Sequence, residues 1–281
     1  MDNSPNRTTH LISACLELTN ECEVNCPYCL LDCKQQFVSK KRLFQIVDAL
    51  LEHGVRRFSI GGGEPLCSED VYSIGIRIKE ASSESLLRTS GCRPINLNII
   101  EQAYDLIDIS IDSTSAVYYR RCKPNADIKI VLKNIEDILK ASFELRCNVL
   151  VTKLNYNDII RSIEHLILLG VKNIRMQQLI HRGLSKAKYE ELMISGNAYN
   201  TLMEELKHIS ERAKVHISDL KSTTQRALCI IKPNGLVYIA NQFCLEFFGD
   251  IFDHATLTKV GEQLYDIQKE LYQSKAEFYL P

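Results

Sequence analysis

The sequence predicts an α/β fold built on a parallel sheet, because strand-like apolar runs alternate with helix-like segments through most of its 281 residues. Strands joined by helices of this length need right-handed crossovers, which align the strands in parallel. Polar or glycine-rich segments follow the predicted strands, where parallel sheets place their ligand sites. The last third differs, because residues 232–235 form a hairpin signal, KPNG.

The first strand is the apolar run at residues 11–18, which leads into a cysteine-rich loop. Residues 38–53 form a helix, because apolar side chains recur at helical spacing and Gly54 supplies a C-cap. The strand at residues 57–60 runs into consecutive glycines, which let the backbone approach a ligand closely.

The alternation continues with four more helix–strand pairs. Apolar positions at helical spacing define the helices, and short apolar runs define the strands. The pairs are residues 68–82 with 86–88, 97–104 with 106–111, 128–142 with 147–151, and 158–169 with 174–179. Beyond them we predict a helix at 197–213, hairpin strands at 228–231 and 236–239, and a helix at 257–272.

Composition indicates a globular chain with metal or redox chemistry. Hydrophobic residues make up 45% and charged residues 25%, which supports a sizeable core. The net charge of −1 provides no global field for nucleic acid or for an anionic membrane, and no apolar run suits a signal peptide or a membrane span. Eleven cysteines then indicate a reducing compartment rather than disulfides. We expect a cytoplasmic protein with no nucleic-acid or membrane partner.

The cysteine loop, residues 21–33, reads ECEVNCPYCLLDC. Cys22, Cys26 and Cys29 stand as CxxxCxxC and can hold three corners of a [4Fe–4S] cluster, which leaves one iron open to a ligand. Zinc bound by four thiolates, with Cys33 as the fourth, is one alternative. Part of a ferredoxin-type run, from Cys26 to Cys33, is another. The third alternative is a set of reduced thiols that bind no metal.

Two motifs resemble the radical S-adenosylmethionine (SAM) superfamily. Tyr28 precedes the third cysteine, as an aromatic residue does in the signature of that family. Residues 62–65, Gly-Gly-Glu-Pro, resemble the family segment that binds the amino group of SAM. The two motifs stand in the family's order and at its distance, which is hard to reconcile with a zinc module. The resemblance implies a [4Fe–4S] cluster and SAM as cofactors, and Cys33 as a non-ligand.

The resemblance also implies the architecture. Residues 1–190 match a partial (β/α)6 TIM-like barrel, and residues 191–281 match a small C-terminal α+β extension containing the β-hairpin, similar to SPASM or twitch regions. Those regions bind auxiliary clusters through several cysteines. Here Cys229 and Cys244 are the last two cysteines after Cys147, so we expect no complete auxiliary cluster.

The resemblance assigns site residues one by one. Cys22, Cys26 and Cys29 are expected to ligate the cluster, and Cys67, Cys92 and Cys122 to include a hydrogen-atom donor for a substrate radical. The residues expected to bind SAM are Tyr28, Gly62, Gly63, Glu64, Thr89, Ser110 and either Arg120 or Arg121.

The expected activity is reductive cleavage of SAM, followed by hydrogen abstraction from a substrate. A peptide substrate follows from the maturases that share the hairpin region. A small metabolite is the alternative, because the short segment before the first cluster cysteine leaves no room for a fused peptide-recognition domain. If the substrate is a peptide, a separate protein would recognise it. An electron donor such as a flavodoxin or ferredoxin is implied, and a non-catalytic iron–sulfur or zinc protein is the alternative of another class.

Overall fold

The computed structural model describes residues 11–31, 38–183, 185–220, 228–240 and 244–273. Its strands are β1 Ser13–Thr19, β2 Arg57–Gly62, β3 Glu84–Thr89, β4 Leu106–Ser110, β5 Leu145–Val151, β6 Asn173–Gln178, β7 His216–Leu220, β8 Leu228–Ile231, β9 Leu236–Ala240 and β10 Leu245–Asp250. Its α-helices are α1 Lys40–Glu52, α2 Val71–Glu80, α3 Leu97–Ala103, α4 Ala116–Cys122, α5 Ile128–Lys140, α6 Ile159–Leu169, α7 Ser185–Leu192, α8 Gly196–Ala213 and α9 His254–Gln273.

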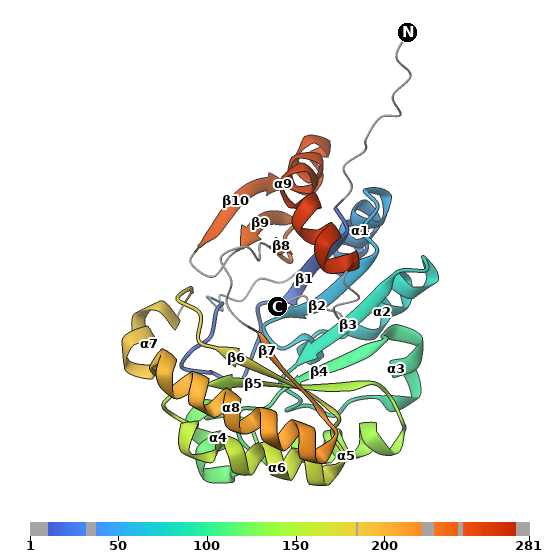
Figure 1. The fold of residues 1–281 in the computed structure, drawn as a ribbon. Coiled ribbons are helices and arrows are strands. Elements are labelled where there is room, and N and C mark those ends of the chain that lie inside the picture. Colours follow the sequence, from blue (N-terminus) through green and yellow to red (C-terminus); the bar gives the residue numbers. More distant parts are fainter. Residues whose placement is uncertain (1–10, 32–37, 184, 221–227, 241–243, 274–281) are drawn as a thin grey trace.

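One sheet contains every strand of the described residues (Figure 1). The strands follow the order β10-β9-β8-β1-β2-β3-β4-β5-β6-β7. From β8 to β7 each neighbouring pair is parallel, whereas β8–β9 and β9–β10 are antiparallel. The order runs from one free edge to the other, so this part of the chain forms an open, curved sheet. The predicted α/β class with a partial barrel is confirmed.

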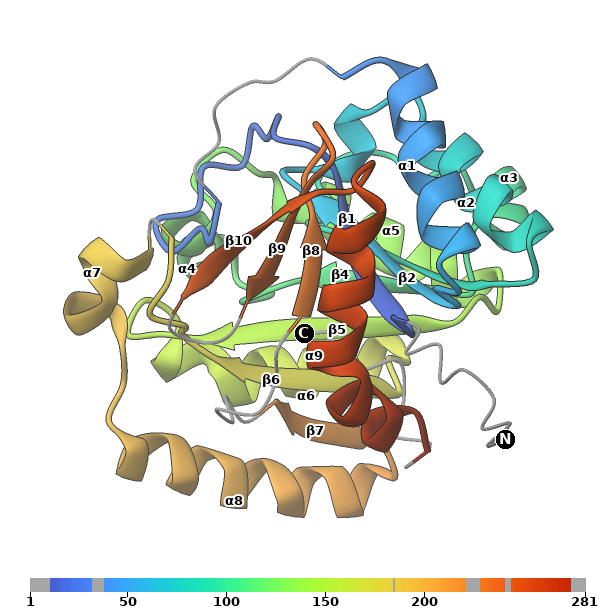
Figure 2. The same cartoon turned by 90° about the horizontal axis from the view of Figure 1, so that it is seen from above.

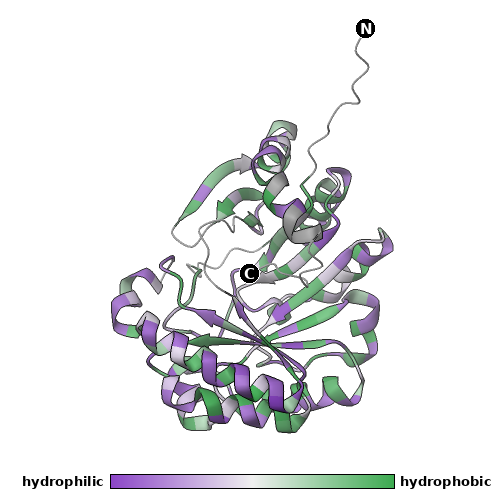
Figure 3. Ribbon diagram, viewed as in Figure 1, coloured by the Kyte–Doolittle hydropathy of each residue, from purple (hydrophilic) through white to green (hydrophobic). Residues whose placement is uncertain are grey.

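The helices lie around the outside of the curved sheet (Figures 1 and 2). Helix α5 illustrates why. The Asp127 side chain caps its first turn by accepting a hydrogen bond from the Lys129 amide at 3.0 Å. Its apolar stripe is buried against the sheet and consists of Ile128, Val131, Ile135 and Ile138. Each such burial contributes roughly 1.5–3 kcal/mol. Figure 3 shows the same division, with apolar residues on the strands and hydrophilic ones along the outer side of α8.

The concave side of the sheet is polar in its centre. Arg88 on β3 is the register partner of Asp108 on β4, and Asp108 is the partner of Arg146 on β5. Because side chains alternate between faces along a strand, the apolar neighbours of Asp108 pack under the helices while Asp108 faces inward. This inward charge lines the pocket on the concave side of the sheet.

The last ninety residues extend both edges of the core sheet. Strand β7 pairs with β6 at one edge, and β8 pairs with β1 at the other. The Lys232 ammonium, next to the hairpin turn, contacts both oxygens of Glu17 on β1 at 2.9 and 2.8 Å. The division near residue 190 stays a prediction. Within the described part of the chain, no helix has the length and apolarity needed to cross a membrane.

Four elements were not predicted: β7, β10, α4 and α7. Strand β7 is five residues long and contains His216, Ser218 and Asp219, which have weak strand preference. The strand follows Lys214, which ends α8 in a left-handed conformation (φ 55°). The pairing with β6 overrides the local preference.

Candidate active site

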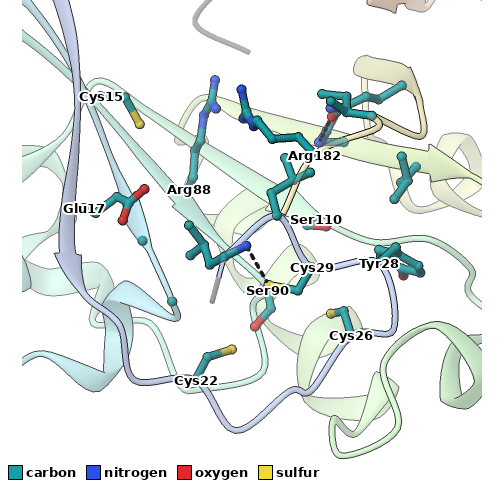
Figure 4. A pocket seen from close by; sticks show the side chains of 18 of the residues that line it. Cys15, Glu17, Cys22, Cys26, Tyr28, Cys29, Arg88, Ser90, Ser110 and Arg182 are labelled. Carbon is teal, nitrogen blue, oxygen red and sulfur yellow. Dashed lines mark hydrogen bonds between the residues drawn. The ribbon is translucent and has the colours of Figure 1, made fainter. Parts of the chain in front are cut away.

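A pocket of about 380 Å³ lies on the concave side of the sheet, near the C-terminal ends of its parallel strands. Its wall combines the cysteine loop, the glycine motif after β2 and side chains from β1 and from β3 to β6. Figure 4 shows Cys22 and Cys26 at one end of this pocket and Arg88 with Arg182 at the other.

Cys22, Cys26 and Cys29 all line this pocket and are partly buried. They lie on the loop between β1 and α1. Asn25 adopts a left-handed conformation (φ 56°), which turns the chain between the first two cysteines. The Cys29 amide donates to the Cys26 carbonyl at 3.2 Å, which closes the second turn. Cys33 lies outside the described residues.

The three thiols fit an iron–sulfur cluster. Burial raises the pKa of the Cys26 thiol to about 12, so a thiolate there needs a compensating cation such as iron. Among the described residues, no three His, Cys, Asp or Glu side chains converge on a single metal ion. The cysteines of a cubane cluster bind different irons, so they need not converge on one point.

The glycine motif packs directly on the cysteine loop. The Gly63 amide donates to the Thr19 carbonyl at 2.7 Å, and the Glu64 amide donates to the Glu21 carbonyl at 2.7 Å. A Cβ on Gly63 would lie 2.2 Å from the Glu21 carbonyl oxygen. Gly62 has a φ of +116°, which also requires glycine. These contacts hold the loop that carries the cysteines against the end of β2.

The Glu64 carboxylate ties the end of β2 to the end of β3. It is 1% exposed. It accepts hydrogen bonds from the Thr89 hydroxyl at 2.6 Å and from the Ser90 amide and hydroxyl at 2.8 and 2.5 Å. The predicted SAM-binding residues Glu64 and Thr89 are therefore in contact with each other. Their mutual bonds set the shape of this wall.

A buried network connects the cysteine loop to β4. The Tyr28 hydroxyl donates to Asp112 at 2.5 Å, and the Lys123 ammonium lies 3.2 Å from the same carboxylate. Lys123 also donates to the Ser110 hydroxyl at 2.9 Å and to the Ser110 carbonyl. Burial lowers the pKa of Lys123, but Asp112 and the neighbouring groups outweigh it and raise the pKa. The lysine is therefore held in its charged form.

The Radical SAM superfamily profile matches residues 16–166, which are more than half of the 281 residues. The chain belongs to the radical SAM superfamily. The predicted family, the enzyme class and the cofactors, a [4Fe–4S] cluster and SAM, are thereby confirmed.

Relatives of this radical SAM protein include GTP 3′,8-cyclases. It is 27% identical over 152 residues to a probable GTP 3′,8-cyclase of Methanococcus maripaludis, covering 51% of each chain. It is 27% identical over 202 residues to the GTP 3′,8-cyclase of Campylobacter lari, covering 66% of this chain and 57% of that one. The chain thus spans about half the length of the curated relatives it matches.

Solved radical SAM structures share its fold. Streptococcus suis SuiB bound to precursor peptide SuiA superimposes with a TM-score of 0.70 and 15% identity, covering 82% of this chain and 59% of that chain. The protein anSMEcpe with bound AdoMet and Cp18Cys peptide gives a TM-score of 0.68 and 15% identity, covering 88% and 80%. At this identity the similarity shows the fold.

The expectation that Arg120 or Arg121 reaches the pocket of this radical SAM protein needs correction. Both side chains are exposed on α4, and Arg121 stacks on the Tyr118 ring at 5.0 Å. The helix turns Tyr119 toward the core. Lys123, the first residue after α4, reaches Ser110 instead. The orientation of α4, a short helix that was not predicted, therefore places Lys123 in the site instead of Arg120 or Arg121.

The cysteines predicted as hydrogen donors do not line the pocket. Cys67 donates to the Glu23 carboxylate at 3.0 Å, and the Cys92 sulfur lies 2.9 Å from the Ser90 hydroxyl oxygen. Cys122 is fully buried, which raises the pKa of its thiol to about 12. Their role as donors stays a prediction. Cys15, which lines the pocket from β1, was missed.

The charged residues at the far end of the pocket were also missed: Glu17, Arg88, Asp108, Arg182 and Lys232. A signal for them exists, because Asp108 interrupts the apolar run at residues 106–111, which we assigned to a strand of the parallel sheet. Such strands in parallel sheets are usually apolar throughout. A charge in that position therefore indicates a polar cavity inside the barrel.

Proposed function

We propose that this protein cleaves SAM reductively in the pocket and removes a hydrogen atom from a substrate bound beside it. The observation that carries the proposal is that Cys22, Cys26 and Cys29 line one pocket together with the glycine motif and a separate polar end. A [4Fe–4S] cluster held by Cys22, Cys26 and Cys29 would supply the electron for the reductive cleavage of SAM.

In that reaction, the residues of this chain bind the cluster and SAM and shape the space for the substrate. The three cysteines hold the cluster, and the backbone at Gly62 and Gly63 forms the adjoining wall. Glu64 fixes the ends of β2 and β3 through Thr89 and Ser90, and Lys123 fixes the Ser110 hydroxyl at the end of β4. The substrate occupies the remaining space, between these groups and the charged end of the pocket.

A small polar metabolite is the substrate class we favour. Charged side chains inside the barrel, such as Arg88 and Asp108, suit a compact polar ligand. The relatives named GTP 3′,8-cyclase support the same class, because their name refers to a nucleotide.

A peptide substrate is the second candidate. Two structures that share the fold, SuiB and anSMEcpe, were solved with peptides bound. For this chain a separate protein would present the peptide, and a flavodoxin or ferredoxin would supply electrons in either case.

Anaerobic reconstitution tests the proposal. We expect about four irons per chain and formation of 5′-deoxyadenosine after reduction with dithionite in the presence of SAM. Cys26→Ala should lose the charge-transfer absorption of the cluster and the 5′-deoxyadenosine product. The matched control is Cys244→Ala, which removes an exposed thiol that does not line the pocket and should behave as wild type. Bound zinc, or a cluster that leaves SAM intact, would overturn the proposal.

A further inference from the structure

The end of the pocket opposite the cysteines carries an excess of positive charge. Arg88, Arg182 and Lys232 line this end together with Glu17 and Cys15. Figure 4 shows the guanidinium groups of Arg88 and Arg182 extending to the same side, away from Cys22 and Cys26. Lys232 is committed to Glu17, whose two oxygens it contacts at 2.9 and 2.8 Å. Arg88 is the cation at this end whose donor atoms lack partners among the described residues.

Two hydrogen-bond donor atoms of Arg88 have no acceptor among the described residues. Its side chain is 22% exposed, yet neither Nε nor Nη2 makes a hydrogen bond among the described residues. The nearest acid is Asp108, whose Oδ2 lies 3.9 Å from Nε, which is too long for a hydrogen bond. Buried donors without acceptors are costly, so such donors in a pocket indicate a missing acceptor.

Asp108 compensates Arg88 only in part, because two other arginines share its Oδ2 and its Oδ1 makes no hydrogen bond among the described residues. Its Oδ2 accepts from Arg175 Nη2 at 2.6 Å and from Arg146 Nη2 at 2.8 Å. Both arginines are fully buried behind the pocket wall. Three arginines (Arg88, Arg146 and Arg175) thus surround the single carboxylate of Asp108 at this end of the pocket.

We propose that this end of the pocket binds an oxyanion, a phosphate or carboxylate group, carried by the substrate. Arg88 donates to it through its guanidinium, whose planar fork matches two oxygens of such a group. Arg182 contributes the second guanidinium. The inference rests on the proposed function and specifies its substrate class as an anionic small molecule. The bound anion compensates the excess charge and directs the rest of the substrate toward the cysteine end.

The test uses reconstituted protein saturated with SAM. Inorganic pyrophosphate and malonate are the probes, titrated by isothermal calorimetry and by thermal unfolding. We expect wild type to bind at least one of them and to unfold at a higher temperature in its presence. Preference for pyrophosphate assigns the site to phosphate chemistry, and preference for malonate assigns it to carboxylate chemistry.

Variants then locate the site. Arg88→Gln should weaken binding of the preferred probe about tenfold or more, and Arg88→Lys should have an intermediate effect because it keeps the charge but loses the fork. Arg212→Gln is the matched control, since its side chain is 74% exposed on α8, and it should bind the probe as wild type does. The affinity of Arg88→Gln for SAM should change less than twofold.

Three outcomes would overturn the inference. In the first, wild type binds neither probe. In the second, Arg88→Gln and Arg212→Gln change probe binding equally. In the third, Arg88→Gln loses affinity for SAM but keeps its affinity for the probe. The last outcome would assign Arg88 to the carboxylate of SAM. Failure of the proposed function gives a different result: wild type would then bind the probe but form no 5′-deoxyadenosine.

Discussion

The Lys123 ammonium lies 3.2 Å from the Asp112 carboxylate, with both side chains almost fully buried. Asp112 also accepts from the Tyr28 hydroxyl and from the Leu150 amide at 2.9 Å, so the pair joins the cysteine loop to β5. On its other side Lys123 contacts Ser110 at the end of β4. One buried ion pair thus holds together three segments that form the pocket wall.

The first prediction concerns that pair. Lys123→Met should lower the free energy of unfolding by about 3–5 kcal/mol, because it leaves Asp112 buried without a counter-charge. Urea denaturation measures the loss. The double variant Lys123→Met/Asp112→Asn should lose less than the sum of the two single variants, since no buried charge is then left alone. Strictly additive losses would show that the two groups do not interact.

The second prediction concerns Asp108 and pH. Burial raises the pKa of this carboxyl, but Arg175, Arg146 and Arg88 outweigh it and lower the pKa from 3.8 to about 2. A lowered pKa means that the ionised carboxylate stabilises the fold above about pH 4, and that this contribution is lost as the pH falls from about 4 to about 2. The amount is roughly 2 kcal/mol.

Asp108→Asn tests this dependence. The amide does not titrate, so the difference in unfolding free energy between wild type and Asp108→Asn should shrink as the pH falls through that window. Urea denaturation of the cluster-free protein at several pH values measures the difference. A difference that stays constant down to pH 2 would contradict the assignment of the shift to Asp108.

The third prediction concerns Glu64. Glu64→Ala should weaken SAM binding about tenfold while the iron content stays near normal, because the carboxylate organises Thr89 and Ser90 but contacts no cysteine ligand. Calorimetry with SAM and an iron assay give the two readouts. Glu84→Ala is the control, since its side chain is 48% exposed at the start of β3. Lost iron with unchanged SAM affinity would count against the role of Glu64.

Local pattern was sufficient to predict much of this fold. The alternation of strands and helices predicts β1 to β6 and their parallel order, because each helix carries an apolar stripe with a clear period. Strand β7 escaped prediction because its five residues are largely polar and their conformation depends on pairing with β6. The course of the extension along both sheet edges likewise depends on long-range pairing.

The same distinction between local pattern and long-range pairing applies to the residues of the site. The cysteine and glycine motifs are contiguous in sequence, so their positions were predictable. The charged end of the pocket joins residues from distant strands, such as Arg88 and Arg182, and no short window of sequence contains them together. The choice of Lys123 over Arg120 and Arg121 depends on where α4 ends, and helix ends are the least predictable feature of a sequence.

The last prediction concerns the packing of the glycine motif on the cysteine loop. Gly63→Ala places a methyl group 2.2 Å from the Glu21 carbonyl oxygen, so the backbone that leads into Cys22 must shift. Such overpacking costs about 1–3 kcal/mol and moves the first cluster ligand, so iron content after reconstitution should fall clearly below that of wild type. Gly196→Ala is the matched control, because no atom lies within 4 Å of its added methyl group. It should keep full iron content and equal or slightly greater stability. If Gly63→Ala bound iron as well as Gly196→Ala, the glycine would not be needed to hold the cysteine loop, and its role would lie with the ligand alone.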